Sequence, residues 1–355
     1  MIFTYGILYQ GYKDTVPQNS ERDNHVRMRF QLEPRLTALL VNLEEKTFEP
    51  SSLYTKQIYI PKKRVAQIPT VIDKIVQHVI CDNYAYDALT KPLIKETSAC
   101  MIGRGTHYAV LLVKEQLRRL CRTHGKDFYA LKCDIKSYFA SIPRDRLIKL
   151  VDRYVGDNDV KTIMLKYIAL LEQGVALGLQ QSQLLANLYL SPLDHYCKEA
   201  LRAEAYGRHM DDFYIVSPDR EYLVRCLARI KTFVENLGLT LNPKTTITHN
   251  KLNYLGFTFY LDDNGKAVQR LLNEKKHAKK RHIRMMMREV IHNERTVDSF
   301  VRSYMSWRSH VLHGDCYKMV DEWDSKIRAF LNMLGFDWKI KGNKVKLYVK
   351  NNWSA

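Results

Sequence analysis

At 355 residues, the chain is long enough for two or three subdomains with a hydrophobic core. Its 56 Lys and Arg residues outnumber 38 Asp and Glu residues, and the net charge of +18 favours a polyanionic partner, nucleic acid first. Seven scattered cysteines without a CxxC pair argue against a disulfide framework and a structural zinc site. With no signal-peptide pattern and no apolar run of membrane-spanning length, we expect a cytoplasmic protein without membrane contact.

The first part of the chain is predicted to be mostly helical. Leucines recur at helical spacing over residues 25–50, and Val and Ile do so over residues 71–88. Between these segments, residues 56–61 are a candidate for a short strand. We therefore expect two amphipathic helices on either side of one strand.

The pattern changes at residue 128. A strand is predicted over residues 128–135, a helix from about Pro143, which suits a first helical turn, and another helix over 158–172. Residues 174–181 are expected to be a loop, and Ser182 is expected to be the N-cap of the leucine-rich helix that follows.

A β-hairpin is predicted next. Apolar residues flank Met210-Asp211-Asp212, so two adjacent carboxylates are expected at the hairpin tip. A helix is predicted over 219–237. Short strands are then predicted at 239–241, 245–248, 254–257 and 267–268. Asp262-Asp263-Asn264-Gly265 joins the last two, and its Asn-Gly step is a strong hairpin signal.

The elements after residue 128 follow a βαββαβ order. This order predicts an α+β fold with an antiparallel sheet and helices on one face. Beyond residue 270 the chain is expected to be helical and basic, and its position after the sheet favours nucleic-acid binding over a merely solvated face. The bases singled out there are Lys275, Lys276, Lys279, Lys280, Arg281 and Arg284. The segment 338–349 predicts either a β-ribbon with one basic face or a solvated edge.

Three acids are expected at the ends of strands. Asp134 closes an apolar run, and Asp211 and Asp212 occupy the hairpin tip. An adjacent Asp pair is by itself more often a solvated turn than a catalytic group. Three such carboxylates together, however, are what two-metal phosphoryl transfer requires.

Segments that lie in order between about residues 55 and 260 resemble the motifs of reverse transcriptases of the group II intron and retron type. They are 64–69, 103–107, 134–142, 178–183, 209–213, 241–245 and 254–257. The resemblance implies a right-hand polymerase with fingers, a ferredoxin-like palm and a short helical thumb. It assigns residues 1–127 to an N-terminal segment and fingers, 128–268 to the palm with a helical fingers insertion at about 144–180, 269–335 to the basic thumb and 336–355 to a basic tail.

The same resemblance implies the roles of the polar residues. Asp134 and Asp211 would bridge two Mg²⁺ ions, for which Mn²⁺ can substitute, and Asp212 would complete the acidic cluster. Ile135 would offer its backbone carbonyl to the nucleotide-bound metal. Lys244 resembles the lysine that protonates the departing pyrophosphate, although a surface lysine is the default interpretation without the motif.

Further residues are implied to bind the nucleotide or the primer. Lys63 and Arg64 would clamp the triphosphate, with Lys62 as the alternative to Lys63. Phe139 matches the ring that blocks a ribose 2′-hydroxyl, a role that is compatible with its being a core aromatic residue. The remaining implied contacts are Leu177, Gly178, Ser182 and Gln183 at the nucleotide, and Tyr254, Leu255 and Gly256 at the primer grip.

Two departures narrow the resemblance. Most relatives carry Gln-Gly where this chain has Leu177-Gly178. The pattern aliphatic-Gly-x-x-x-Ser-Gln, which residues 177–183 follow, resembles that of reverse transcriptases of diversity-generating retroelements. Leu177 cannot hydrogen-bond near the sugar of the incoming nucleotide, so discrimination against wrong partners is expected to fall. The resemblance implies errors chiefly at template adenines. The second departure is His209, where Tyr or Phe is usual.

The resemblance also implies partners and a biological setting. These are template RNA, primer and cDNA, dNTPs and a small basic accessory variability protein that is oligomeric, in a bacterial, archaeal or phage-encoded system with mutagenic retrohoming. Two alternatives stay open. One is a retron-like or phage-defence reverse transcriptase, and the other is an RNA-binding scaffold with a silent active site.

Overall fold

The computed structural model describes residues 3–58, 64–312, 314–341 and 344–349. The chain divides into two compact units, and each is described by itself. Unit 1 comprises residues 1–109, 133–215 and 221–246, and unit 2 comprises residues 110–132, 216–220 and 247–355. None of the helices in the described ranges is long and apolar enough to cross a membrane.

Unit 1 begins with three helices and a β-ribbon. They are α1 (Tyr5–Thr15), α2 (Asp23–Phe30), α3 (Leu32–Glu44), β1 (Tyr54–Ile58) and β2 (Arg64–Ile68). The predicted helix over 25–50 is therefore two helices, because Gln31 leaves helical geometry with φ −116° and ψ 26°. The strand predicted over 56–61 is found at β1, although its last residues lie outside the described ranges. β1 pairs with β2 in antiparallel register.

The second predicted helix is confirmed. It consists of α4 (Val71–Ile80), a π-helical turn at Cys81–Ala85 and α5 (Tyr86–Thr90). Thr70 and Asp73 form a capping box at its start, in which each side chain bonds the backbone N–H of the other. α6 (Thr106–His124) follows.

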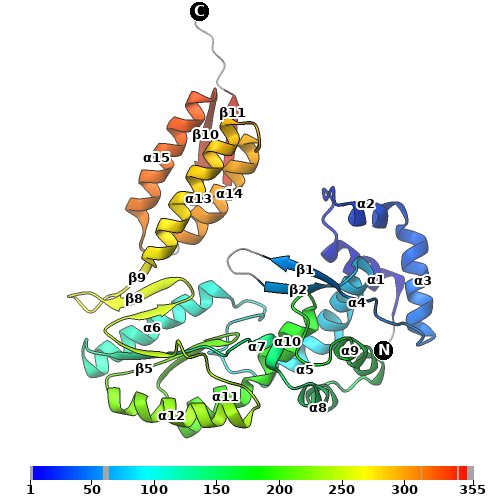
Figure 1. Cartoon of the computed structure of the whole chain (residues 1–355), viewed down its shortest axis with the longest axis horizontal. Coiled ribbons are helices and arrows are strands. Elements are labelled where there is room, and N and C mark those ends of the chain that lie inside the picture. The colour runs from blue at the N-terminus through cyan, green and yellow to red at the C-terminus, as the bar shows by residue number, and fades with distance from the viewer. Residues whose placement is uncertain (1–2, 59–63, 313, 342–343, 350–355) are drawn as a thin grey trace, which may run out of the picture. The chain divides into compact units, whose positions relative to one another are not determined.

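The predicted βαββαβ arrangement is confirmed by a four-stranded sheet. Its strands are β3 (Tyr129–Cys133), β4 (Ala205–His209), β5 (Asp212–Ser217) and β6 (Thr246–His249), in the order β4-β5-β3-β6. The connecting helices include α7 (Tyr138–Ser141), α8 (Arg144–Tyr154), α9 (Asn158–Ala169), α10 (Gln180–Tyr189), α11 (Ser191–His195) and α12 (Arg220–Asn236). Figure 1 shows α11 and α12 along the sheet. This strand order places β3 beside β5, the two strands whose ends carry the three acids.

Two local predictions in this region are wrong. Ser182 is not an N-cap, because α10 starts two residues earlier at Gln180 and leaves Ser182 buried in the first turn, with 2% of its surface exposed. Residues 239–241 do not form a strand. Leu241 makes only an isolated antiparallel bridge with Ile135.

Unit 2 contains a three-stranded antiparallel sheet of β7 (Leu252–Tyr254), β8 (Phe257–Leu261) and β9 (Ala267–Leu271). The hairpin predicted around Asn264-Gly265 joins β8 to β9. The strand predicted at 254–257 is instead a tight turn, because Leu255 (φ 49°) and Gly256 (φ 89°) both adopt left-handed backbone geometry. The pattern of apolar residues does not predict such a turn, because the pattern depends on side-chain type and the turn depends on backbone conformation.

The last part of unit 2 is a helical bundle with a β-ribbon. It consists of α13 (Asn273–Ile291), α14 (Val297–Leu312), α15 (Tyr317–Met333), β10 (Phe336–Lys341) and β11 (Lys344–Val349), and Figure 1 shows the three helices side by side with the ribbon against them. The ribbon has the basic face that was one of the two predictions, since Lys339 lies opposite Lys346 while Trp338 lies opposite Leu347. Trp338 is 1% exposed and packs among core residues of the helices.

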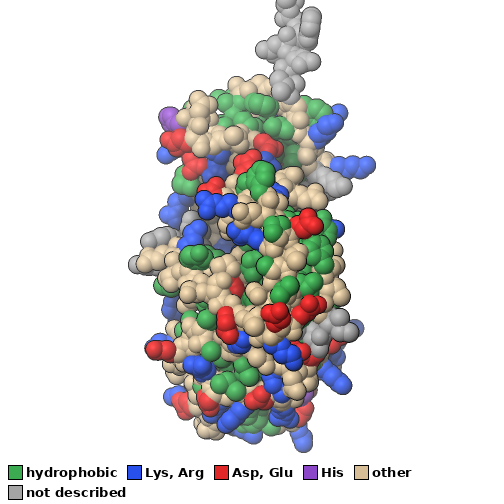
Figure 2. Space-filling model, turned by 90° about the vertical axis from the view of Figure 1, so that its right-hand side faces the viewer, with side chains coloured by type: hydrophobic (Ala, Val, Ile, Leu, Met, Phe, Trp, Pro, Cys, Tyr) green, Lys and Arg blue, Asp and Glu red, His purple; other side chains and the backbone are tan. Residues whose placement is uncertain are grey.

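Charge is mixed over at least part of the surface. Figure 2 shows a face on which basic, acidic and apolar side chains are interspersed. The net charge of +18 is therefore not expressed there as one continuous basic patch.

Candidate active site

The three predicted carboxylates lie at the ends of neighbouring strands. Asp134 follows β3 directly, Asp211 lies in the turn before β5, and Asp212 is the first residue of β5. All three are half-buried. Burial raises the pKa of the nearby Tyr138 well above its ordinary value, and the charge of Asp211 raises it further. Asp211 is therefore electrostatically close to the segment that follows Asp134.

The predicted lysine motif is bound directly to Asp134. The Asn242 backbone N–H donates to the Asp134 carbonyl oxygen at 2.7 Å, and the Asn242 side-chain amide donates to Asp134 Oδ2 at 2.9 Å. The Lys136 N–H donates to the Thr240 carbonyl at 2.8 Å. These bonds hold the two segments together without a regular strand, and they show that Asn242, which the sequence reasoning gave no role, fixes one carboxylate oxygen.

Lys244 lies two residues beyond this contact. Its backbone N–H donates to Asn242 Oδ1 at 3.1 Å, and its side chain is exposed. The ammonium group is thus in solvent, where it keeps full freedom to reach a phosphate. Its role as a proton donor stays a prediction.

The donor set fits magnesium. Carboxylate and carbonyl oxygens are hard ligands, and Mg²⁺ is usually held by one or two carboxylates together with substrate phosphates and water. In the described part of the chain, no three Asp, Glu, His or Cys side chains are gathered closely enough to hold a metal ion. Asp134 and Asp211 therefore fit a site that phosphate oxygens help to complete, and Ile135, 2% exposed, can contribute only its backbone carbonyl.

The loop that precedes residues 177–183, called the second motif below, contacts the segment around Phe139. The Val175 N–H donates to the Phe139 carbonyl at 2.8 Å, and the Gly174 N–H donates to the Ile142 carbonyl at 3.1 Å. Phe139 is half-buried and packs edge-on against Tyr138, with ring centroids 5.8 Å apart. The structure thus brings Phe139 and the loop that leads to Leu177 together, as the predicted nucleotide site requires. Leu177 is itself half-buried.

Gly178 lies where another backbone passes closely. A Cβ atom at this position would collide with the carbonyl oxygen of Gln67 in β2 and approach Pro69 Cδ to 2.8 Å. Only glycine allows this contact between the second motif and the β1–β2 ribbon.

The last two residues of the second motif differ in exposure. Ser182 is buried, whereas Gln183 is exposed and its Oε1 atom accepts a hydrogen bond from Cys100 Sγ at 3.1 Å. Ser182 can therefore act on a nucleotide only through the packing of α10, and Gln183 is the member of the pair with access to solvent.

Part of the predicted triphosphate clamp falls outside the described ranges. Lys62 and Lys63 lie there entirely, and the side chain of Arg64 is not described. The clamp stays a prediction from the sequence.

His209 is held next to the turn that carries Asp211. Its Nδ1 atom lies 3.0 Å from Ser98 Oγ, which also donates to the Arg208 carbonyl at 3.0 Å. Burial lowers the pKa of His209, and the charge of Arg208 lowers it further. The imidazole is thus biased toward its neutral form.

Arg208 is a residue that the sequence analysis missed. It is fully buried and pairs with the fully buried Asp194 through two bonds of 2.6 Å. Burial lowers the pKa of Arg208, but Asp194 more than offsets this, so the net pKa lies above the ordinary value. An Arg inside an otherwise apolar strand, between Gly207 and the Asp pair, was the available signal.

In unit 2, the predicted primer grip is the β7–β8 turn. Tyr254 is 1% exposed, and the Gly256 carbonyl accepts from the Leu272 N–H at 3.1 Å. A Cβ atom on Gly256 would approach Lys275 Nζ to 2.8 Å, so the first lysine of α13 lies over this turn. The predicted basic residues of α13 are all exposed or half-buried, as contact with nucleic acid would need.

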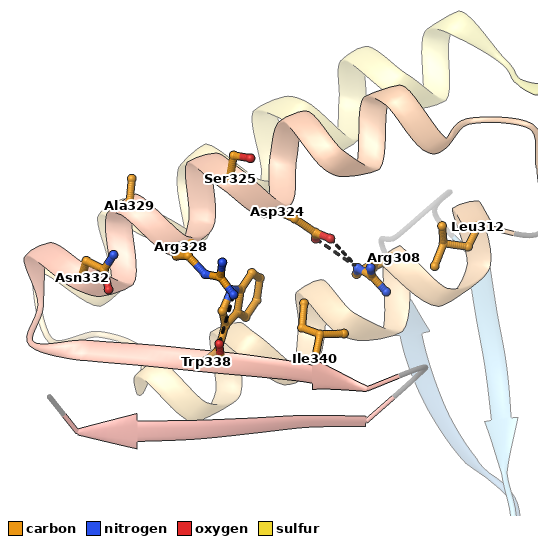
Figure 3. Close-up of a pocket in the computed structure, with 9 residues that line it drawn as sticks. All are labelled: Arg308, Leu312, Asp324, Ser325, Arg328, Ala329, Asn332, Trp338 and Ile340. Atoms are coloured by element: carbon orange, nitrogen blue, oxygen red, sulfur yellow. Dashed lines mark hydrogen bonds and ion pairs between the residues drawn. The ribbon is translucent and has the colours of Figure 1, made fainter.

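A separate pocket of about 730 Å³ lies between α14, α15 and β10 (Figure 3). Arg308 and Asp324 form a two-bond ion pair there, and Arg328 reaches the Trp338 carbonyl at 3.3 Å. None of the predicted catalytic residues lines it. Its size alone therefore does not mark it as the active site.

Comparisons with known proteins show the family of the chain. Residues 55–259 match the family described as reverse transcriptase (RNA-dependent DNA polymerase). The chain is 27% identical over 191 residues to Protein YkfC of Escherichia coli (strain K12), which is 50% of this chain and 49% of that protein. It therefore spans about half the length of the curated relative that it matches.

Solved telomerase structures are distant neighbours. Telomerase from Candida albicans, in complex with a fragment of telomeric RNA, has a TM-score of 0.47 at 13% identity and covers 64% of this chain and 47% of its own. Apo telomerase from Candida tropicalis has a TM-score of 0.45 at 12% identity and covers 60% and 47%. The sequence match covers more than half of this chain and includes Asp134, Asp211, Asp212 and Lys244. The chain belongs to the reverse transcriptase (RNA-dependent DNA polymerase) family, and its α+β fold is that of a polymerase of this family.

Proposed function

We propose that the chain is an RNA-directed DNA polymerase that extends a primer with dNTPs on a template RNA. The observation that carries this proposal is the position of Asp134, Asp211 and Asp212 at the ends of neighbouring strands inside the matched region, with Asn242 fixing one oxygen of Asp134. Acids at the ends of neighbouring strands have no structural purpose in a silent scaffold, because like charges repel one another.

The proposed chemistry divides among the chain's own groups. When bound, two Mg²⁺ ions would activate the primer 3′-hydroxyl and stabilise the leaving pyrophosphate. Asp134 and Asp211 would hold them through carboxylate oxygens, and Asp212 would complete the acidic set. Lys244, exposed on its short turn, donates a proton to the departing pyrophosphate. Phe139 excludes a ribose 2′-hydroxyl by the bulk of its ring.

We further propose the domain roles and the partners. Residues 1–127 form the N-terminal segment and fingers, 128–268 the palm and 269–335 the thumb, and the β-ribbon that shares the core of α13–α15 works with the thumb. The bases of α13 bind the phosphates of primer and template. A small basic accessory variability protein serves as the further partner.

The finer proposal is low-fidelity synthesis for a diversity-generating retroelement. It is supported by Leu177, which has no hydrogen-bonding group, and by Ser182-Gln183 in the same motif. A site that lacks a polar contact to the nucleotide loses discrimination between correct and wrong partners. We propose that the errors fall on template adenines, in cDNA made from a template-repeat RNA for mutagenic retrohoming.

The test is to sequence cDNA made by the purified chain on a defined RNA template with Mg²⁺ and dNTPs. Leu177→Gln should lower misincorporation opposite template adenines. Leu177→Met is the matched control, because it keeps the volume and adds no hydrogen-bonding amide. An unchanged error spectrum in the Gln variant would refute the role of Leu177. Absence of cDNA from the wild-type chain, with and without an accessory protein, would refute the polymerase itself.

A further inference from the structure

We propose that Arg208 is a positioning residue for catalysis. Its buried guanidinium fixes the backbone of the Met210-Asp211-Asp212 turn and so aims the Asp211 carboxylate. The inference rests on the proposed polymerase function, because it concerns the same site.

Every N–H group of the Arg208 guanidinium has a partner. Nε donates to Asp194 Oδ1 and Nη2 to Asp194 Oδ2, both at 2.6 Å. Nη1 donates to Asn187 Oδ1 and Nη2 to the Asn187 carbonyl, both at 3.0 Å. The remaining N–H of Nη1 donates to the Met210 carbonyl at 2.9 Å. Since an Arg side chain has five such groups, none is left over.

The bond to Met210 acts on an unusual backbone conformation. Met210 has φ 60°, in the left-handed region that a residue with a Cβ atom rarely adopts. Such a conformation persists only when its surroundings hold it in place. The guanidinium supplies that restraint at the carbonyl immediately before Asp211.

The guanidinium is itself held from several directions. Asp194 also accepts from the Tyr206 hydroxyl at 2.5 Å and from Thr97 Oγ1 at 2.9 Å. Asn187 donates through Nδ2 to the Ala99 carbonyl at 2.7 Å. Asp194, Asn187 and Thr97 are all 0% exposed. Arg208 therefore ties the catalytic turn to α10, α11 and the segment 97–99 as one rigid frame.

A role in stability alone explains this network poorly. Desolvation of two charges offsets most of their mutual attraction, so apolar residues often replace buried ion pairs without loss of stability. The bond from the Arg208 guanidinium to the Met210 carbonyl instead fixes the geometry of the turn that carries Asp211. Catalytic groups lose activity steeply when they are displaced by even about 1 Å.

The primary test is Arg208→Lys, assayed in the full-length chain. Lysine keeps the charge but presents three donors on a single nitrogen, so it cannot replace the five bonds that Arg208 makes from three nitrogens. We expect kcat for Mg²⁺-dependent primer extension to fall about 100-fold. The Mg²⁺ concentration for half-maximal activity should rise. The Kd for primer–template, measured by fluorescence anisotropy, should stay within about twofold of the wild-type value.

A matched control exists in unit 2. Arg308 makes two bonds to Asp324, at 2.9 and 3.0 Å, and both side chains are largely buried. Arg308→Lys should lower the melting temperature without changing the Mg²⁺ requirement. A shift of the Mg²⁺ requirement in this variant as large as that of Arg208→Lys would overturn the proposal.

A rescue separates positioning from folding. Glycine adopts a positive φ without steric cost, so adding Met210→Gly to Arg208→Lys should recover at least part of kcat, by about tenfold. The neutral pair Arg208→Gln with Asp194→Asn, which leaves no unpaired buried charge, should fold and still show the raised Mg²⁺ requirement. The proposal would be overturned if the activity of the Arg208 variants fell only in proportion to the fraction of folded protein, while their Mg²⁺ requirement stayed at the wild-type value. A wild-type chain without any polymerase activity would instead refute the proposed function.

Discussion

Two β-hairpins of this chain carry adjacent aspartates at their tips, and different bonds hold the two tips. In the β8–β9 hairpin, Asp262 Oδ1 accepts from the Asn264 N–H at 3.0 Å and from the Lys266 N–H at 2.9 Å. Its carboxylate therefore stabilises its own turn. In the β4–β5 hairpin, the Met210 carbonyl is held by the buried Arg208, which lies outside the turn.

The left-handed position of each tip differs as well. It is Gly265 in the β8–β9 hairpin and Met210 in the β4–β5 hairpin. The first turn is capped by its own Asp262 side chain, and Lys126 also donates to the Asp263 carbonyl. The second turn instead depends on a buried network that reaches Asn187 and Asp194. The two tips share an Asp-Asp pair and differ in what supports the backbone, so the dipeptide by itself does not distinguish the proposed catalytic tip.

The largest difference between the two tips should appear in activity. Asp211→Ala should lower the rate of cDNA synthesis by about 1,000-fold or more, because a lost metal ligand forfeits several kcal/mol of charge stabilisation. Asp263→Ala, the matched change at the exposed tip, should retain wild-type activity. Primer-extension assays in Mg²⁺ measure both. Equal loss in the two variants would break the comparison.

The next effect concerns the left-handed residue of the solvated tip. Gly265 has φ 74°, so Gly265→Ala should lower the free energy of unfolding by about 1–2 kcal/mol. Gly156, which has an ordinary φ and no atom within 4 Å of an added Cβ, provides the control. Gly156→Ala should not destabilise the chain. Urea unfolding of the three proteins gives the answer, and equal stability of the two variants would contradict the strain argument.

A smaller effect is expected from the Asp262 side chain. Asp262→Ala removes two backbone hydrogen bonds and should cost about 1 kcal/mol of unfolding free energy, with cDNA synthesis unchanged. Asp263→Ala removes no such cap and should stay within about 0.5 kcal/mol of wild type. Loss of synthesis in Asp262→Ala would show that the second tip also takes part in the chemistry.

The smallest effect is a pH dependence confined to the catalytic hairpin. The pKa of His209 in the folded chain lies below its ordinary value of 6.5, so the unfolded chain binds the proton first as pH falls. The contribution of neutral His209 to stability is complete above pH 6.5 and is lost progressively below it. His209→Gln should flatten this acid-side decline, as followed by urea unfolding across pH. Gly265→Ala should instead lower stability by the same amount at each pH.

The sequence predicted the elements whose signals are local. The Asn-Gly step predicted the β8–β9 hairpin, and apolar residues around Asp211 predicted the β4–β5 hairpin. The βαββαβ order predicted the sheet, in which the structure places β3 beside β5. These features depend on spacing and turn chemistry, which can be read along the chain.

Features that depend on distant partners were missed or misplaced. The Arg208 network joins Asn187 and Asp194 to β4. The spacing of these residues in the sequence does not predict that they share hydrogen bonds. Serine favours the N-cap position, which predicts a cap at Ser182, but α10 begins at Gln180 and Ser182 is buried in its first turn. The turn at Leu255-Gly256 was predicted as strand because its neighbours are apolar.

The packing of Trp338 into the core of α13–α15 has a practical consequence for spectroscopy. The described tryptophans, Trp307, Trp323 and Trp338, all belong to unit 2. Their indole emission therefore reports on that unit, while far-ultraviolet circular dichroism reports on the whole chain. Comparing the two signals during denaturation shows whether the two units unfold together or one after the other.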